Sequence, residues 1–236
     1  MTREYQVKIK LAANLRAIWI IFEGNRAVGV EFDRNMMTSQ IRARREVILS
    51  AGTTNSAQLL MLSGIGPKEH LAKFNIPLVA DLPVGNNLQD HGAGFLSYTL
   101  SPKIQTAAQK LQSNQSINEY IYSRSGPLAS SEFQAWLAFL NKQSVNPKVD
   151  YPDYELYFVE ITKEIAMSEL GLKPEVYKSL FGPYENDPMM LCASQILHPK
   201  SRGTVRLKSS DPYDPPLIDP NYFDDPSDLD DVVAGK

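Results

Sequence analysis

The stretch that most constrains the fold runs from residue 46 to residue 66 and reads EVILSAGTTNSAQLLMLSGIG. A short apolar run at 47–49 is followed by small residues at 50–52, then by a polar segment and a second apolar run that ends at Leu62. A bounded apolar run, a tight turn and a helix form the unit from which α/β nucleotide-binding sheets are built. The stretch therefore predicts a buried strand at 47–49 and a helix at 56–62, with Thr53, Thr54 or Asn55 as its cap and Gly64 just beyond its end.

Antiparallel strands are expected before this unit. The β-rich runs 18–22 and 27–32 flank the turn 23–26, which predicts a hairpin, and a third strand is expected at 39–43. A looser alternation favours a strand over 3–11. After the unit, Pro67 suits the first turn of a helix at 68–74, and a short extended piece is expected at 78–80.

The second half of the chain has a different pattern, beginning near residue 95. It predicts strands at 95–100, 154–161, 189–197 and 204–207, the last two paired around 198–203, with helical segments within 106–122 and 163–181. Residues 225–228 favour the start of a helix that runs through Val233. Strands separated by helices and long loops predict an α+β region.

Composition excludes several classes of protein. The 236 residues carry a net charge of −3, which gives no reason to expect nucleic acid as a partner. No apolar run approaches the roughly 20 residues of a transmembrane helix, and the N-terminus lacks the apolar core of a secretory signal. One cysteine and three histidines with scattered positions provide no zinc-site spacing, so no metal site is expected.

Three blocks of sequence resemble one family. Residues 46–67 are similar to the second signature of the glucose–methanol–choline (GMC) oxidoreductases, in a form closest to the arthropod glucose-dehydrogenase-like branch. The block LPVGNNLQDH at 82–91 and the block HPKSRGTVRLKSSDPYDPPLIDPNYF at 198–223 resemble two further family blocks, in the family's order. Ala57 stands where the family usually has proline, and Thr53–Thr54 replaces a small–aliphatic pair.

The resemblance implies an α/β plus α+β fold, with part of a three-layer FAD/NAD(P)-binding domain and an antiparallel-sheet substrate domain. It implies a division into residues 1–94 of the FAD-binding domain, 95–210 of the substrate-binding domain, and 211–236 as the start of a segment that returns to the FAD domain. FAD is the implied cofactor. The residues implied to contact it are Ala17, Ser50, Ala51, Gly52 and Ser56.

Each of these residues also has a plainer interpretation. The small residues at 50–52 either allow the flavin cofactor to approach the backbone or serve only a tight strand-to-helix connection. Ala17, whose backbone would meet the adenine ring, is otherwise an ordinary strand residue, and a register slip of one would turn its side chain to the other face. Asp90 and His91 invite an acid–base interpretation, but a structural loop is favoured, and His70 and His198 are expected at the surface or behind the site.

The aromatic residues of the second half could line a substrate pocket, although the core of a sheet is the commoner place for them. They are Phe133, Trp136, Phe139, Tyr151, Tyr154, Tyr157 and Phe158.

The implied activity is oxidation of a CH–OH group, in an alcohol or sugar, by hydride transfer to flavin, with a quinone or oxygen as the acceptor. The G-x-G-x-x-G fingerprint and the family's catalytic histidine are not found in the chain. The expectation is therefore a partial chain, without catalytic residues of its own and inactive alone, and secretion is possible by the resemblance. The alternative is an inactive remnant that acts as a binding module. An upstream fingerprint and a downstream histidine would favour the enzyme.

Overall fold

The structure is a computed structural model, and it describes residues 14–101, 103–111, 113–129, 134–141, 151–168, 170–185 and 187–234. The chain divides into two compact units, one of residues 1–89 with 202–221, the other of residues 90–201 with 222–236. The domain boundaries expected at residues 94 and 210 stay a prediction. The strand expected at 3–11 lies outside the described residues.

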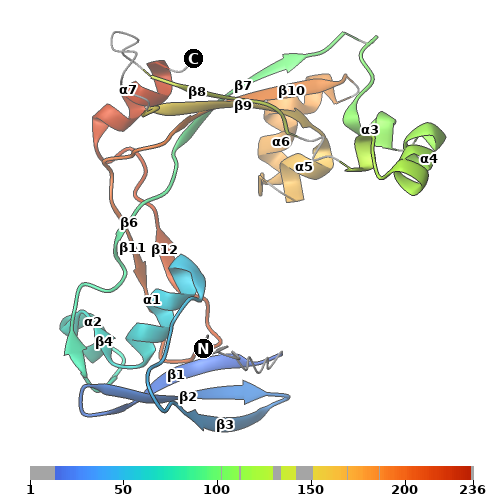
Figure 1. The fold of residues 1–236 in the computed structure, drawn as a ribbon. Coiled ribbons are helices and arrows are strands. Elements are labelled where there is room, and N and C mark those ends of the chain that lie inside the picture. Colours follow the sequence, from blue (N-terminus) through green and yellow to red (C-terminus); the bar gives the residue numbers. More distant parts are fainter. Residues whose placement is uncertain are drawn as a thin grey trace, which may run out of the picture. The chain divides into compact units, whose positions relative to one another are not determined.

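The first unit begins with an antiparallel sheet of three strands in sequence order (Figure 1). The strands are β1 (Arg16–Glu23), β2 (Arg26–Arg34) and β3 (Met37–Arg42). The predicted hairpin is confirmed, since Glu23 pairs with Arg26 across a turn in which Gly24 has a φ of 57°. The buried face of β1 carries Ile18 and Ile20, as the alternation of the sequence requires.

The helix α1 (Gly52–Leu62) follows and begins four residues before its predicted start, with Ala51 as an N-cap that makes no side-chain cap bond. Gly64 ends it as predicted: its φ of 89° is the left-handed conformation, and its N–H donates to the Met61 carbonyl at 3.1 Å. Beyond it lie β4 (Ile65–Gly66), α2 (Lys68–Ala72) and β5 (Ala80–Asp81), and β4 and β5 pair in parallel.

The buried strand predicted at 47–49 is wrong for this structure. These residues adopt no strand conformation, and the Ile48 side chain is 79% exposed. A parallel strand is buried only when neighbours pair with it and helices cover it, and no described residue pairs with this segment. Ile48 therefore lies open to solvent, while Val47 and Leu49 are half-buried.

The core of the first unit joins distant parts of the sequence. Met61 and Leu71 pack with Val205 and Leu207, all at most 2% exposed. The last two come from β11 (Gly203–Arg206) and the residue after it, and β11 lies between β12 (Leu217–Asp219) and β6 (Asn86–Leu88). The predicted pairing of the strands around 198–203 is therefore wrong, because β11 pairs within the first unit and β10 (Met189–Ile196) within the second.

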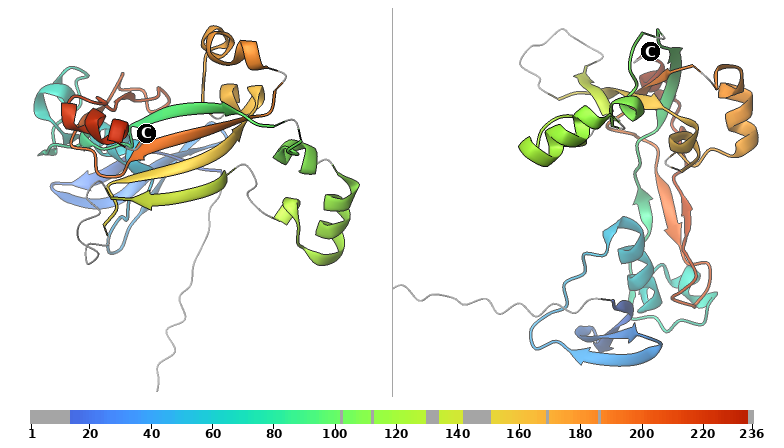
Figure 2. Two further views of the ribbon diagram at one scale, coloured as in Figure 1. Left: turned by 90° about the horizontal axis from the view of Figure 1, so that it is seen from above. Right: turned by 90° about the vertical axis from the view of Figure 1, so that its right-hand side faces the viewer.

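The second unit is built on an antiparallel sheet with the order β7-β10-β9-β8 (Figure 2). Its other strands are β7 (Ala93–Thr99), β8 (Gln134–Leu140) and β9 (Tyr154–Ile161), the last with the predicted bounds. The helices α5 (Lys163–Ser168) and α6 (Pro174–Phe181) cover one face of this sheet (Figure 1). Val159, Leu191 and Tyr177 belong to the apolar cluster between the sheet and these helices.

The remaining helices of the second unit are α3 (Ala107–Leu111), α4 (Asn114–Ser123) and α7 (Pro226–Ala234), with 3₁₀ turns η1 (Pro127–Ala129) and η2 (Gly182–Tyr184). The predicted helix in the C-terminal segment is confirmed by α7. Within the described ranges, no helix has the length and apolar character required to cross a bilayer.

Candidate functional site

Two of the predicted site residues, distant in the sequence, line one cavity in the first unit. This β1–α1 cavity has a volume of about 500 Å³. It brings together Ala17 of β1 and Ala51, the residue before α1. The complete lining is Leu15, Arg16, Ala17, Ala51, Asn55, Gln58, Leu59, Leu62 and Pro212.

Local structure explains why Ala17 lies at the cavity. Ile18 and Ile20 point to the buried face of β1. Ala17, the second residue of this strand, is exposed. The β1–β2 ladder shifts register between Ala17 and Trp19, and Ala17 pairs with Phe32. A register irregularity of this kind re-aims the neighbouring side chains, so the face of Ala17 could not be read from alternation alone.

The turn at the start of α1 favours glycine at position 52 because of its backbone conformation, and it leaves open space around that residue. Gly52 has a φ of 83°, a conformation that residues with a Cβ rarely adopt. A Cβ placed on Gly52 would have no heavy atom within 4 Å. The backbone at this turn is therefore open to close approach by another molecule.

Gly52 and the other two predicted residues, Ser50 and Ser56, are not part of the cavity lining. Ser56 holds the turn, since its Oγ accepts the N–H of Ala51 at 3.1 Å. Ser50 is exposed. Thus Ala17 and Ala51 line the cavity, Gly52 follows Ala51 in the chain, and Ser56 braces the turn.

Apart from the three leucines, four lining residues were not predicted as site residues: Arg16, Asn55, Gln58 and Pro212. The Gln58 side chain is 7% exposed, and its Nε2 donates to the Asp214 carbonyl at 2.7 Å. Arg16 donates from Nη2 to the Pro212 carbonyl, and its guanidinium lies 4.6 Å from the centre of the Tyr213 ring. Pro212 thus lines the cavity, and Tyr213 and Asp214 contact Arg16 and Gln58, from a part of the chain that no local pattern links to β1 or α1.

The Tyr213 hydroxyl extends this arrangement by donating to Asp33 Oδ2. Asp33 also accepts from the Thr38 hydroxyl at 2.6 Å. The hydrogen bond from Thr38, and then that from Tyr213, lower the pKa of the Asp33 carboxyl below its ordinary value. Asp33 is therefore a carboxylate at neutral pH and fixes the aromatic ring beside Arg16.

The three histidines have structural positions. His91 Nδ1 lies 2.7 Å from the Ile196 carbonyl oxygen. The backbone N–H of His91 donates to Asp90 Oδ1 at 2.9 Å, which agrees with a structural loop. His198 stacks on Tyr151 with ring centres 4.2 Å apart. In the described part of the chain, no histidine ring bonds to a carboxylate, so none has the arrangement of an acid–base pair.

His70, which was expected at the surface or behind the site, is half-buried. Its Nε2 accepts the N–H of Leu207 at 2.9 Å, so it joins α2 to the residue after β11. Burial, and then the nearby charges of Arg206 and Lys73, lower the pKa of its imidazole. The neutral ring is the form that can accept this hydrogen bond.

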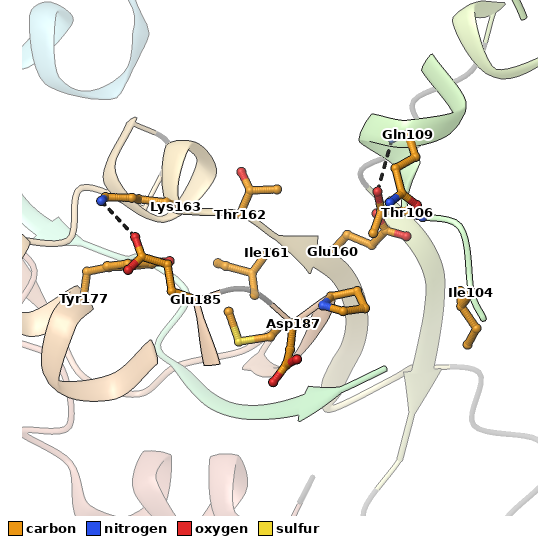
Figure 3. A pocket seen from close by; sticks show the side chains of 12 residues that line it. Ile104, Thr106, Gln109, Glu160, Ile161, Thr162, Lys163, Tyr177, Glu185 and Asp187 are labelled. Carbon is orange, nitrogen blue, oxygen red and sulfur yellow. Dashed lines mark hydrogen bonds and ion pairs between the residues drawn. The ribbon is translucent and has the colours of Figure 1, made fainter. Parts of the chain in front are cut away.

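The second unit has its own cavities. One of about 530 Å³ lies at the end of β9 and the start of β10 (Figure 3). Lys163 Nζ and Glu185 Oε1 form an ion pair at 3.0 Å within its lining, and Thr106 and Gln109 hydrogen-bond to each other. No group of three or more His, Cys, Asp or Glu residues able to hold a metal occurs in the described ranges.

The face of the sheet opposite α5 and α6 is apolar and hollowed. A cavity of about 390 Å³ there is lined by Leu96, Tyr98, Leu156, Phe158, Met190, Cys192 and Ser194. Of the aromatic residues singled out in the sequence, Phe158 lines this cavity, whereas Tyr157 packs against the core on the helix side. Phe139 and Tyr151 are exposed and Tyr154 is half-buried; Phe133 and the side chain of Trp136 lie outside what the structure describes.

Two parts of the chain match models of one protein family. A family model described as GMC oxidoreductase matches residues 3–93, and a second matches residues 199–236. Ecdysone oxidase of Bombyx mori is 38% identical over 215 residues, covering 89% of this chain and 31% of that protein. The mitochondrial choline dehydrogenase of Homo sapiens is 34% identical over 229 residues, covering 96% of this chain and 36% of that protein.

Among solved structures, formate oxidase superposes with a TM-score of 0.75 at 23% identity, covering 94% of this chain and 41% of that one. A related structure, of a variant Aspergillus oryzae formate oxidase, was solved to study modification of its FAD. The fold is thus that of part of formate oxidase. The chain belongs to the GMC oxidoreductase family, whose cofactor is FAD. It spans about a third of the length of the curated relatives it matches.

Proposed function

We propose that this chain forms one wall of the FAD site and part of the substrate domain of an oxidoreductase that oxidises a CH–OH group. The donor is a small alcohol or sugar, and the electron acceptor is a quinone or oxygen. The relatives carry the names ecdysone oxidase and choline dehydrogenase, which differ widely in substrate, so they do not choose a donor for this chain.

The observation that carries the proposal is the meeting of Ala17 and Ala51 at the β1–α1 cavity. The sequence predicts cofactor contact for both, and they come from different elements. Neither has a side chain beyond Cβ, so a flat ring can approach the backbone of both. The residues present therefore fit the cofactor.

The neighbouring turn supports the same assignment. Gly52 offers an open backbone face, and Ser56 fixes the turn through the Ala51 N–H. We assign Ala17, Ala51 and Gly52 to contact with the cofactor, Ser56 to positioning of the turn, and Ser50 to its solvent-exposed edge. FAD supplies the hydride acceptor when it is bound.

Two variants, each of which replaces an alanine with leucine, test the cavity. In the complete protein that contains this chain, Ala51→Leu places a branched side chain in the lining, whereas Ala72→Leu adds the same atoms at an exposed position of α2. Titration with FAD, followed by flavin fluorescence, is expected to show at least about tenfold weaker binding for Ala51→Leu. Ala72→Leu is expected to bind as the unaltered protein does. Equal binding by all three proteins would contradict the assignment.

A second experiment tests the activity. Anaerobic addition of alcohols and sugars to the FAD-loaded complete protein is expected to bleach the flavin absorbance with at least one donor. Failure with every donor would favour the alternative function, an interaction module. The observation in favour of that alternative is the exposed apolar surface of the second unit, with Tyr98 at 51% and Phe139 at 59% exposure.

A further inference from the structure

The polar chemistry of the β1–α1 cavity is concentrated in few side chains. Most of the lining is apolar or small, and the polar members are Arg16, Asn55 and Gln58. Ligand sites commonly combine an apolar surface with a small number of fixed polar groups that set specificity.

Gln58 is held most firmly. Its side chain is 7% exposed, and its Nε2 donates to the Asp214 carbonyl at 2.7 Å. Because a carbonyl can only accept, this bond fixes which end of the amide is nitrogen and which is oxygen. Asn55, in contrast, is exposed.

The fixed amide leaves one hydrogen-bond acceptor for a ligand. Among the described residues, none donates a hydrogen bond to Gln58 Oε1. An acceptor on a cavity-lining residue that has no protein partner is left for water or a ligand to donate to. The cavity therefore favours a ligand that carries a hydrogen-bond donor, such as an amino group on a ring.

Arg16 adds a fixed positive charge to the same cavity. Its guanidinium is held by the Pro212 carbonyl and by the Tyr213 ring, which Asp33 in turn fixes. The small side chains of Ala17 and Ala51, one acceptor and one cation together suit an aminopurine attached to phosphate. Adenine presents an amino donor at its 6-position, where guanine and hypoxanthine present a carbonyl acceptor.

We infer that Gln58 determines which purine the cavity takes, by accepting a hydrogen bond from the exocyclic amino group of the adenine of FAD. This inference rests on the proposed function, because it assigns the adenine end of the cofactor to the β1–α1 cavity. A hypoxanthine ring would place its carbonyl oxygen against Gln58 Oε1, so two acceptors would face each other with no proton between them. A site built to pair with a donor rejects an analogue that lacks it.

The test compares FAD with flavin hypoxanthine dinucleotide, which differs only in the purine. Binding of both to the complete protein is measured by flavin fluorescence for the unaltered protein, for Gln58→Met and for Asn55→Ala. The unaltered protein is expected to prefer FAD by at least about tenfold. Gln58→Met keeps the length of the side chain without the acceptor, so its preference is expected to fall to about twofold or less. Asn55→Ala is expected to keep the full preference.

The ratio of the affinity for FAD to the affinity for flavin hypoxanthine dinucleotide distinguishes loss of purine recognition from a general loosening of the fold. If Gln58→Met only loosened the loop at Asp214, both dinucleotides would weaken together and the preference would remain, which would overturn the inference. Equal binding of the two by the unaltered protein would overturn the inference and leave the proposed function intact. Binding of neither would overturn both.

Discussion

The carboxylate of Asp228 on α7 accepts the backbone N–H of Ser201 at 2.8 Å, and its other oxygen accepts the N–H of Lys200 at the same distance. Asp228 is only 2% exposed. In return, the Ser201 Oγ accepts the N–H of Asp225 at 3.0 Å. The start of α7 and the segment after β10 are thus joined by bonds in both directions.

Removing the charge of Asp228 is expected to destabilise the second unit. In Asp228→Asn, an amide group replaces one carboxylate oxygen and faces a backbone N–H, so one buried donor loses its acceptor. The expected loss is about 1–3 kcal/mol in the free energy of unfolding. Urea unfolding followed by circular dichroism measures it. Asp230→Asn, on the exposed side of the same helix, is expected to change stability by less than about 0.5 kcal/mol.

The unaltered protein and Asp228→Asn should also differ in how their stability changes as the pH is lowered. Burial raises the pKa of Asp228, but the hydrogen bonds from Lys200 and Ser201 outweigh it and hold the pKa below 3.8. A lowered carboxyl pKa gives stability that is present above the unfolded value and is lost as the pH falls through the folded value. The difference between the unaltered protein and Asp228→Asn is expected to shrink below about pH 4. A difference that stays constant at low pH would contradict this account.

His70 predicts a pH dependence for the first unit. Its pKa is lowered from 6.5, so the unfolded chain takes up a proton at a pH where the folded unit does not. Stability is therefore present above about pH 6.5 and is lost as the pH falls from there through the folded pKa. His70→Gln keeps an acceptor for the Leu207 N–H but does not titrate, so its stability should be flatter between pH 7 and pH 5. Thermal unfolding across that range measures the slope, and equal slopes for both proteins would contradict the role of His70.

Two glycines give a matched test of close packing. Gly64 has a φ of 89°, and a Cβ there would overlap the Pro77 carbonyl oxygen and lie 2.9 Å from Val79 Cγ2. Gly24 has a φ of 57° and no atom within 4 Å. Gly24→Ala is expected to cost about 1 kcal/mol for backbone strain alone. Gly64→Ala is expected to cost more, by about 1–3 kcal/mol, because the added atom also overpacks. Similar losses in urea unfolding would show that the region around Pro77 relaxes freely.

Local sequence patterns predicted a helix or strand well where the residues of that element indicate its type and its ends. β9 has the predicted bounds because apolar and other residues alternate along it, and α5 begins two residues after its end. The end of α1 was predicted because Gly64 can adopt a positive φ without strain. The segment at 47–49 failed because its apolar residues indicate burial but do not provide the neighbouring strand that burial requires.

The candidate site was only half predictable for a related reason. Ala51 lies within a sequence block that resembles the family, and Ala17 lies at a fixed spacing from the predicted hairpin. Gln58 and Arg16 acquire their orientation from the backbone of Asp214 and Pro212, which lie 156 and 196 residues away in the chain. Nothing in the sequence near either residue shows that contact, and Gln58 reads as an ordinary polar position on a helix.

The core made by Met61, Leu71, Val205 and Leu207 has a consequence for synthesis of the protein. His70 and Leu207 are 137 residues apart, and the second unit is encoded mostly between them. On the ribosome, α1 and α2 must therefore wait, with their apolar surfaces uncovered, until β11 has left the exit tunnel. During this interval residues 90–201 have already emerged, so the intervening unit can begin to collapse first, and chaperones that hold apolar segments would be expected on α1 and α2 of nascent chains.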